Sequence, residues 1–402
     1  MSGSPSTQAA SLHPGDKKLR IAVLNRTFSP SGGGAERYSI AMVEQLANRH
    51  EMHVFAQEIS HQWRGVTYHR VFLPFRKPRW LNQLWFAFST WRATRCGFDV
   101  VHSHENTWHG DVQTVHVIPV KHNLFHGRTG TALALRWLKV ATSPRLLTYL
   151  LLEHFRYAEH RFRSVVTTSN SLKAVMSISY PACKPRLHVI TPGISMPGSL
   201  TTDKGKKEAR ALLGLPITEH CMLFVANNYL KKGLTTILQA LAQLPVNTVL
   251  AVAGNTDQIL IFKHQAAALK VSARVFFLGS IKDIGLAYQA ADCLVHPTLE
   301  DTFAMVVLEA MAYGLPVIVS GAKYCGISEL LTNGVNAVIL EGPKNVRCLK
   351  EAILNIVCSP LYAGQLSNGA IEFAKQYEWR ELAASQEALY LLIACEKAIK
   401  PT

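Results

Sequence analysis

Short apolar runs separated by amphipathic stretches recur along most of this 402-residue chain. The first run, Leu19 to Leu24, precedes a turn-rich loop from Asn25 to Gly34 and a helical pattern from Ala35 to about Ala47. A second apolar run, His53 to Ala56, completes a strand–helix–strand unit. Alternation of this kind predicts a parallel sheet covered by helices.

The alternation continues in both halves of the chain. In the N-terminal half, the further predicted strands are residues 100–103, 112–116, 165–169 and 188–191. In the C-terminal half, they are residues 222–226, 248–253, 275–278, 293–296 and 316–320. The polar segment 195–208, rich in Gly, Pro and Lys, is predicted to be an interdomain linker. The pattern therefore predicts two doubly wound, Rossmann-like α/β domains with a ligand-binding cleft between them.

These patterns also divide the chain. Residues 1–16 are rich in Ser, Pro, Gly and Ala and have no apolar h-region, so we expect a disordered tail and no signal peptide. Residues 17–195 are expected to form the N-terminal domain and residues 196–375 the C-terminal domain. The longest apolar run, Leu146 to Leu152, is too short to span a bilayer.

Charge is distributed unevenly between the two halves. Residues 1–198 hold 24 Lys and Arg against 10 Asp and Glu, a net charge of +14, whereas residues 199–402 hold 18 against 17. This asymmetry indicates an anionic partner for the N-terminal half. Because no nucleic-acid recognition motif is present, we expect a membrane surface and no nucleic acid. The eight cysteines lack C-x-x-C or zinc spacing, which favours reduced thiols in a cytoplasmic protein.

Residues 297–316 carry the strongest chemical signal. An acidic pair, Glu300 and Asp301, stands where a helix is expected to start, and Glu309 lies about two turns further on. A spacing of eight would place Asp301 and Glu309 on nearly the same helix face. Backbone amides at a helix start are suited to hold a diphosphate or sugar oxygens. A purely structural role, with Asp301 as a cap and Glu309 at the surface, is disfavoured by the apolar neighbours of Glu309.

Two glycine-containing loops follow predicted strands. Residues 223–234 form a strand, a loop with Lys231 and Lys232, and a helix, although both lysines also fit a solvated loop face. Residues 31–37, SGGGAER, allow close backbone approach to a ligand. They do not form G-x-G-x-x-G, and no acidic residue closes the next strand, which disfavours an NAD-dependent oxidoreductase.

Histidines cluster in residues 101–116, and with two carboxylates they raise the hypothesis of a metal site. The residues concerned are His102, His104, His109, His116, Glu105 and Asp111. We expect the side chains of His102 and His104 to point to opposite faces of a strand end, and we therefore predict no metal site.

Residues 297–316 resemble the E-x7-E motif of retaining glycosyltransferase family 4, which has the two-domain GT-B fold; Asp301 stands in the first position in place of the commoner Glu. The resemblance extends over roughly residues 18–395. It implies that the first carboxylate lies by the donor sugar hydroxyls and that Glu309 binds the nucleotide ribose. The Asp also resembles the branch of lipopolysaccharide core glucosyltransferases.

Other segments fit the same family. Lys232 resembles the lysine that neutralises the donor diphosphate, whereas Asn227 replaces the usual arginine. Gly33 and Gly34 resemble part of a G-G-x-E-R segment that faces the donor. His116 resembles the histidine that contacts the transferred sugar. Residues 376–402 are similar to a terminal helix that crosses back to the first domain.

The resemblance implies two sets of site residues. The expected catalytic residues are Asp301, Glu309, Lys232 and His116. The expected donor-binding residues are Gly33, Gly34, Asn227, Lys231, Glu300, Thr302, Phe303, Ala304 and Met305. No cofactor and no metal are expected.

The sequence therefore predicts a retaining, metal-independent hexosyltransferase that moves glucose from UDP-glucose onto a lipid-linked or lipopolysaccharide-core saccharide. Other donors, namely GDP-mannose, UDP-GlcNAc or UDP-galactose, stay open, as does a catalytically silent nucleotide-sugar-binding protein. Segments 72–91 and 133–163 interleave Trp with Lys and Arg. They fit either interfacial helices at the inner face of the cytoplasmic membrane or ordinary helices with a solvated basic face.

Overall fold

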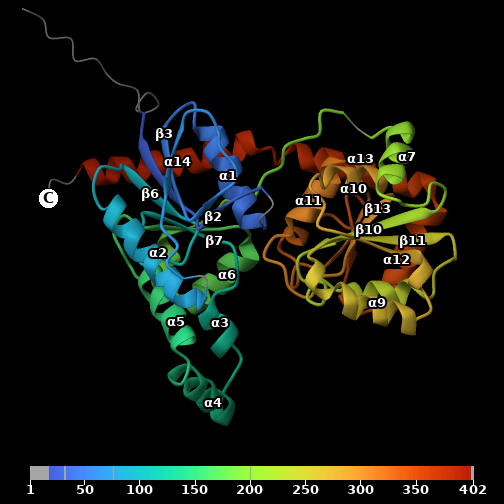
Figure 1. The fold of residues 1–402 in the computed structure, drawn as a ribbon, viewed down its shortest axis with the longest axis horizontal. Helices are drawn as coiled ribbons and strands as arrows, with labels where there is room; N and C mark the ends of the chain where they lie inside the picture. The colour runs from blue at the N-terminus through green and yellow to red at the C-terminus, as the bar shows by residue number, and fades with distance from the viewer. Residues whose placement is uncertain (1–17, 31–32, 76, 200, 400–402) are drawn as a thin grey trace, which may run out of the picture.

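The computed structural model describes residues 18–30, 33–75, 77–199 and 201–399. The predicted tail, residues 1–16, lies outside the described residues, as do Ser31 and Gly32 of the glycine-containing loop. The described chain forms two parallel sheets, each flanked by helices, in two neighbouring α/β bodies (Figure 1). The predicted fold class, two Rossmann-like domains, is confirmed.

The N-terminal sheet has seven strands in the order β5-β3-β1-β6-β7-β8-β9, all paired in parallel. Its strands are β1 (Arg20–Leu24), β3 (Glu51–Ala56), β5 (Val66–Arg70), β6 (Val100–Ser103), β7 (Val112–Val115), β8 (Ser164–Thr167) and β9 (Leu187–Val189). A separate pair is formed by β2 (Thr27–Phe28) and β4 (Glu58–Ile59). The helices of this half are α1 (Gly34–Leu46), α2 (Arg79–Thr94), α3 (Val120–Phe125), α4 (Gly130–Ala141), α5 (Pro144–Arg156) and α6 (Asn170–Ser179).

The C-terminal sheet has six parallel strands in the order β12-β11-β10-β13-β14-β15. Its strands are β10 (His220–Ala226), β11 (Thr248–Gly254), β12 (Val275–Gly279), β13 (Cys293–His296), β14 (Val317–Ser320) and β15 (Val338–Leu340). Its helices are α7 (Asp203–Leu212), α8 (Leu234–Leu241), α9 (Ile259–Ala268), α10 (Gly285–Ala290), α11 (Met305–Ala312), α12 (Val346–Cys358) and α13 (Pro360–Lys375).

Burial on both faces explains why the central strands are readable in the sequence. All four residues of β13 are buried, and so are all four of β6. Parallel sheets covered by helices on both sides favour such continuous apolar runs. The edge strand β5 was missed because its residues are only partly buried and its composition is mixed. Edge strand β15 is only three residues long.

The predicted linker is wrong in its second half, because α7 begins at Asp203. The Thr202 hydroxyl accepts a hydrogen bond from the Gly205 amide and caps this helix. The Lys- and Glu-rich residues that follow are good helix formers on a solvent-exposed face. The polar composition of residues 203–208 therefore belongs to an exposed helix and not to an irregular linker.

The last helix, α14 (Trp379–Ala398), belongs to the core of the N-terminal sheet although it follows the C-terminal one. It lies along the N-terminal half (Figure 1) and contributes Trp379, Leu389, Tyr390 and Ile393 to a core cluster that includes Tyr38 of α1. The Trp379 and Tyr38 rings meet edge to face, with centroids 5.5 Å apart. The chain thus joins the two halves twice, at residues 190–202 and again before α14. Among the described residues, none of the helices combines the length and apolar character needed to cross a bilayer.

Gly193 lies in the first of these connections, directly against Trp379. A Cβ atom on Gly193 would lie 2.8 Å from two ring carbons of Trp379. We therefore expect Gly193→Ala to lower the free energy of unfolding by about 1–3 kcal/mol through overpacking. Gly198→Ala is the matched control, because a Cβ atom there meets nothing within 4 Å. Urea denaturation of both variants measures the difference, and equal stability would contradict this packing.

Candidate active site

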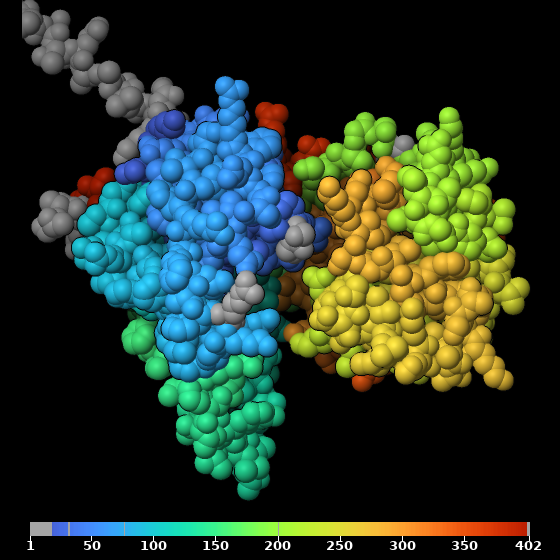
Figure 2. Space-filling view, in the orientation of Figure 1, coloured from blue at the N-terminus to red at the C-terminus, as the bar shows by residue number. Residues whose placement is uncertain are grey.

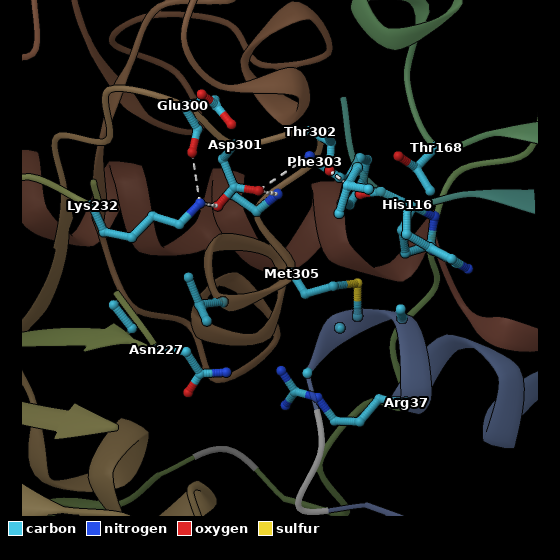
Figure 3. A pocket seen from close by; sticks show the side chains of 18 of the residues that line it. Arg37, His116, Thr168, Asn227, Lys232, Glu300, Asp301, Thr302, Phe303 and Met305 are labelled. Carbon is cyan, nitrogen blue, oxygen red and sulfur yellow. Dashed lines mark hydrogen bonds and ion pairs between the residues drawn. The ribbon is translucent and has the colours of Figure 1, made fainter. Parts of the chain in front are cut away.

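A cavity of about 450 Å³ lies between the two domains, at the carboxyl ends of β7, β8, β10 and β13 (Figure 3). Ligands of doubly wound sheets bind at this edge. The N-terminal side contributes residues 33–37, His116–Ile118, Thr168 and Pro192. The C-terminal side contributes residues 225–227, Lys232, His296 and 300–306.

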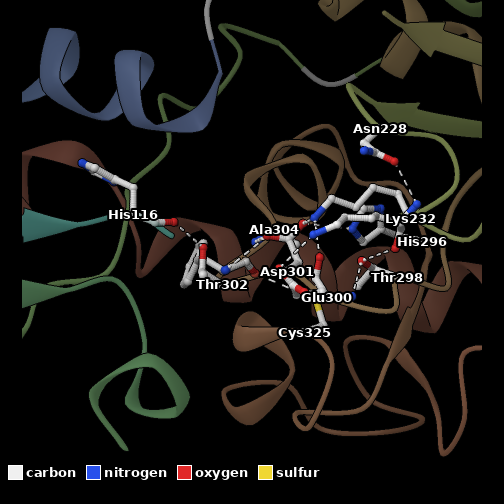
Figure 4. Close-up of polar contacts among 12 residues, drawn as sticks. His116, Asn228, Lys232, His296, Thr298, Glu300, Asp301, Thr302, Ala304 and Cys325 are labelled. Atoms are coloured by element: carbon white, nitrogen blue, oxygen red, sulfur yellow. Dashed lines mark hydrogen bonds and ion pairs between the residues drawn. The ribbon is translucent and has the colours of Figure 1, made fainter. Parts of the chain in front are cut away.

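The Asp301 carboxylate is the centre of the polar contacts on the C-terminal side (Figure 4). Its Oδ2 accepts hydrogen bonds from Lys232 Nζ at 2.6 Å and from His296 Nε2 at 3.3 Å. Its Oδ1 accepts from the backbone amides of Phe303 at 3.3 Å and Ala304 at 2.9 Å. Both oxygens of this carboxylate are therefore engaged by protein donors.

These contacts set the protonation state of Asp301. Burial by itself would raise the pKa of the carboxyl, but the hydrogen bond from His296 and the charge of Lys232 outweigh it and hold the pKa well below its usual range. Burial lowers the pKa of His296, although the neighbouring Asp301 opposes that shift. Asp301 is therefore an anion at neutral pH and forms an ion pair with Lys232, which lines the cavity.

The prediction that Asp301 and Glu309 share a helix face is wrong, because α11 starts at Met305 and not at the acidic pair. Ala304 precedes the helix in the left-handed region, with φ 73°. This conformation is strained for a residue with a Cβ atom, and the Asp301 carboxylate helps to hold it through the Ala304 amide. The turn directs the start of α11 at the cavity, which Met305 and Val306 line.

Lys232 is positioned by the glycine that follows it. Gly233 has φ +88°, and a Cβ atom there would lie 2.1 Å from the Pro297 carbonyl oxygen. Only glycine allows the loop before α8 to approach the loop after β13 so closely. Besides Asp301, Lys232 Nζ contacts the Glu300 carbonyl oxygen at 2.7 Å. Lys231, by contrast, is exposed, and its Nζ lies 3.3 Å from the Glu300 carboxylate.

Glu309 is buried as expected, but behind the cavity wall. Its carboxylate accepts a hydrogen bond from the Tyr288 hydroxyl at 2.6 Å and pairs with Arg37 Nη1 at 2.6 Å. Arg37 comes from α1 of the N-terminal domain and lines the cavity (Figure 3). In this conformation an ion pair between the domains occupies the carboxylate that was predicted to bind ribose.

Further hydrogen bonds join the domains beside the cavity. The Ser169 hydroxyl donates a hydrogen bond to the Thr302 carbonyl oxygen at 2.7 Å. The Thr302 hydroxyl donates to the backbone carbonyl oxygen of His116 at 2.8 Å. The Glu329 carboxylate accepts from the amides of Asn170 and Ser171 at the start of α6. The two Thr302 contacts hold the segment before α11, residues 300–305, against the ends of β7 and β8. The Glu329 contacts hold the start of α6 against the C-terminal domain.

The histidine cluster corrects the prediction of opposite faces for His102 and His104. Positions two apart on a strand share a face, and the two ring centroids are 4.2 Å apart. His104 Nδ1 lies 2.9 Å from His116 Nε2, while His109 lies in a separate cavity near Arg163. Burial, with smaller contributions from neighbouring charges, lowers the pKa of His102 and His116 to about 3. The grouped imidazoles are therefore neutral at neutral pH.

Most predicted site residues line the cavity. They are Gly33, Gly34, His116, Asn227, Lys232, Glu300, Asp301, Thr302, Phe303, Ala304 and Met305. Of the described residues in the predicted set, Lys231 and Glu309 lie outside this lining. Sequence reasoning did not assign Arg37, Thr168 or His296 to the site. Each follows a strand end or a glycine-containing loop, a position that could have identified it.

Two Rossmann-like domains that face each other across a cleft fit the expected GT-B fold, and comparison with known proteins agrees. Residues 32–196 match the model of Glycosyltransferase Family 4, and residues 205–376 match that of Glycosyl transferases group 1. The chain therefore belongs to the GT-B glycosyltransferases, with a family 4 N-terminal domain and a group 1 C-terminal domain.

Individual relatives are distant. A D-inositol 3-phosphate glycosyltransferase of Mycobacterium tuberculosis is 28% identical over 236 residues, which are 57% of this chain and 48% of the relative. This match thus spans about half the length of that curated relative. WaaG, a glycosyltransferase involved in lipopolysaccharide biosynthesis, has a TM-score of 0.78 at 19% identity, covering 91% of this chain and 98% of its own. Anabaena Alr3699/HepE, solved with UDP-glucose, has a TM-score of 0.72 at 19% identity, covering 92% and 99%.

The lowered histidine pKa values predict a pH dependence of stability. His102 titrates at about 3 in the folded protein and at 6.5 when unperturbed, so the unfolded chain binds more protons between these values. The contribution of neutral, buried His102 to the free energy of unfolding is therefore complete above pH 6.5 and is lost as the pH falls toward 3. We expect the free energy of unfolding to fall by up to about 1.4 kcal/mol per pH unit for each such histidine.

Urea denaturation across this pH range tests the assignment. As the pH falls, the His102→Gln variant is expected to lose stability less steeply than the unsubstituted protein. The control variant His264→Gln, at an exposed histidine, is expected to lose stability as steeply as the unsubstituted protein. Identical slopes for His102→Gln and the unsubstituted protein would remove His102 as the source.

Proposed function

We propose that this protein transfers a hexose from a UDP-hexose, with UDP-glucose the first choice, to a hydroxyl of a saccharide acceptor, retaining the anomeric configuration and using no metal ion. The observation that carries the proposal is the placement of Lys232. Its ammonium group lies at the cavity floor beside the start of α11, held by Asp301 and the Glu300 carbonyl.

A leaving nucleoside diphosphate needs compensating charge, and two features of the cavity can supply it. Lys232 is a fixed cation, and Met305 and Val306, the first residues of α11, line the cavity, so that a helix N-terminus, which favours anions, lies beside it. Arg37 is a second cation on the facing wall, 30% exposed as a side chain. Preorganised groups of this kind stabilise developing negative charge without reorganising during the reaction.

In the proposed reaction, the bond between the sugar C1 and the diphosphate oxygen breaks as the acceptor oxygen forms a bond to C1 on the same face. The acceptor proton passes to the departing phosphate oxygen, and UDP leaves. No carboxylate is needed as a covalent nucleophile. The neutral His116 lines the N-terminal side of the cavity, a position suited to contact the transferred sugar.

The roles of the two carboxylates follow from their contacts. Asp301 orients Lys232 and the 301–304 turn, and the proposed contact with the sugar hydroxyls is an additional role for its oxygens. For Glu309 to bind ribose, Arg37 must release it. Arg37 would then be free to move toward the diphosphate. The diphosphate would replace the Glu309 carboxylate as the anion beside the Arg37 guanidinium.

The donor class is supported by fold neighbours. The Anabaena protein was solved with UDP-glucose and with UDP and glucose. The lipopolysaccharide neighbour WaaG is the basis for proposing a lipid-linked or lipopolysaccharide-core saccharide as acceptor.

Nucleotide binding should depend on Lys232. Loss of a charge-assisted contact costs about 1.5–3 kcal/mol, so Lys232→Ala should weaken UDP binding by about tenfold or more. Lys231→Ala is the matched comparison and should change the affinity less, because this neighbour pairs with Glu300 at the surface. Isothermal titration with UDP measures both affinities. Unchanged UDP affinity in Lys232→Ala would remove this lysine from the donor site.

A hydrolysis screen of nucleotide sugars then identifies the donor and separates an enzyme from a silent binding protein. Turnover of UDP-glucose is expected, and it should persist in EDTA because a fixed cation takes the place of the metal ion. Loss of turnover in EDTA with recovery on adding magnesium or manganese would show that the metal-free mechanism is wrong.

We further propose that the protein acts as a peripheral protein at the inner face of the cytoplasmic membrane. Helices α3 to α5 project from the N-terminal domain, with α4 at the tip (Figures 1 and 2). On α4, Leu135, Trp137 and Leu138 are 66%, 57% and 61% exposed. In the sequence, Arg136 lies between Leu135 and Trp137, and Lys139 follows Leu138. Apolar side chains interleaved with cations suit insertion at an anionic lipid surface.

Vesicle co-sedimentation at low ionic strength tests this association. Binding is expected on anionic vesicles and to weaken with salt, since each Lys or Arg near the surface contributes about 1 kcal/mol within the Debye length. Trp137→Ser should reduce binding, whereas Trp63→Ser, an exposed tryptophan on the β4–β5 connection, should not. Equal partition onto neutral vesicles, or none onto either kind, would contradict the proposal.

A further inference from the structure

A second large cavity lies in the N-terminal domain and is lined by residues of α2 and α5, none of which lines the catalytic cavity. It measures about 620 Å³, within the range of about 300–1,000 Å³ that is typical of small-molecule sites. Its walls are largely apolar and include Leu84 of α2, Trp108, and Leu151 and Phe155 of α5. We call this cavity the apolar groove.

One face of α5 leads from the projecting helices into this groove. Leu147, Leu151 and Phe155 follow each other at intervals of four residues and therefore lie on one side of the helix. They are 45%, 49% and 55% exposed, and the last two line the groove. An apolar chain in the groove would lie against Leu151 and Phe155.

The groove adjoins a smaller cavity of about 400 Å³, and Trp108, His160 and Arg163 line both. We call this cavity the basic chamber. It lies by Gly110 and Asp111, directly before β7, whereas the catalytic cavity lies beyond the other end of that strand. The two sites are thus on opposite edges of the sheet.

The chamber carries excess positive charge. Its cations are Arg95, Arg163 and Lys397, and Asp111 is its carboxylate. Lys397 pairs with Asp111 at 3.1 Å. Arg163 donates only to neutral carbonyl oxygens, among them those of Trp108 and Gly110. Within the described part of the chain, the Arg95 side chain has no hydrogen bond or ion pair, and it is exposed.

His109 adds an unsatisfied polar group to this chamber. Both of its ring nitrogens are buried and have no hydrogen-bond partner among the described residues. In either tautomer of a neutral imidazole, one nitrogen is a donor and the other an acceptor. A buried donor without a partner costs free energy, which a ligand oxygen can recover.

We propose that the apolar groove and the basic chamber form one binding site for a single anionic phospholipid molecule, with an acyl chain in the groove and the phosphate in the chamber. The adjoining cavities match the two parts of such a lipid, because one offers largely apolar walls and the other more cations than carboxylates. Arg95, Arg163 and the His109 N–H face the phosphate, and charge-assisted hydrogen bonds are the strong ones in such contacts.

This site is independent of the proposed sugar transfer, since none of its lining residues lines the catalytic cavity. It also differs from adsorption through α4, because one lipid molecule occupies a defined cavity. Binding should therefore saturate at one lipid per chain and should persist in Trp137→Ser.

Short-chain phosphatidylglycerol, kept below the concentration at which it aggregates, is the probe for isothermal titration and native mass spectrometry of the full chain. Saturable binding of one molecule is expected. Arg95→Gln and Leu151→Ser should each weaken it by about fivefold or more. The matched controls are Arg92→Gln, in the last turn of α2 and outside the chamber, and Leu147→Ser, one turn before the groove. Both should keep the affinity of the unsubstituted protein.

Two further ligands separate the parts of the proposal. Phosphatidylcholine with the same chains should bind more weakly, because its headgroup has no net charge. Inorganic phosphate should also bind more weakly, because it leaves the groove empty. The site is overturned if no saturable lipid binding is found, if either ligand binds as tightly as phosphatidylglycerol, or if the control variants lose as much affinity as the site variants.

Discussion

The Asp301 carboxylate accepts hydrogen bonds from three segments of the C-terminal domain that meet only in the folded protein. These are the loop before α8, through Lys232, the end of β13, through His296, and the turn before α11, through the amides of Phe303 and Ala304. A buried carboxylate is tolerated only when such partners compensate its lost hydration. The same contacts place a lysine at the cavity floor and hold Ala304 in its left-handed conformation.

The cleft also depends on how the two domains are joined. Helix α14 completes the N-terminal core, so the C-terminal domain is attached by two connections. Beside the cavity, Arg37 pairs with Glu309, and Ser169 and Thr302 donate hydrogen bonds across the cleft. Such contacts set the separation of the walls while leaving polar groups that a charged ligand can recruit.

The N-terminal domain presents two different edges. At the carboxyl ends of its strands, the neutral His116 lines the cavity, its backbone carbonyl accepts a hydrogen bond from the Thr302 hydroxyl, and the Ser169 hydroxyl donates to the Thr302 carbonyl. At the opposite edge, cations lie beside an apolar groove. Among the described Lys and Arg residues of this half, only Arg37 lines the catalytic cavity, so most of its positive charge lies elsewhere.

Sequence alone determined the central strands and half of the residues that line the cavity, in large part because these positions follow local rules. Strands covered on both faces need continuous apolar runs, and polar residues placed just after such runs must gather at one edge of a parallel sheet. Asp301 and Lys232 stand at such positions, whereas His116 was assigned by resemblance to the glycosyltransferase family. Edge strand β5 and helix α7 could not be predicted by such rules, since partial exposure allows mixed or polar composition.

Tertiary structure decided what depends on partners distant in the chain. The start of α11 at Met305 follows from the turn that Asp301 stabilises, and this moves Glu309 off the face that spacing had assigned to it. Glu309 finds Arg37 from the other domain, and the His102 ring lies beside that of His104. Helical spacing and strand alternation describe one element at a time, whereas the pairing of buried charges is set by whichever elements the fold brings together.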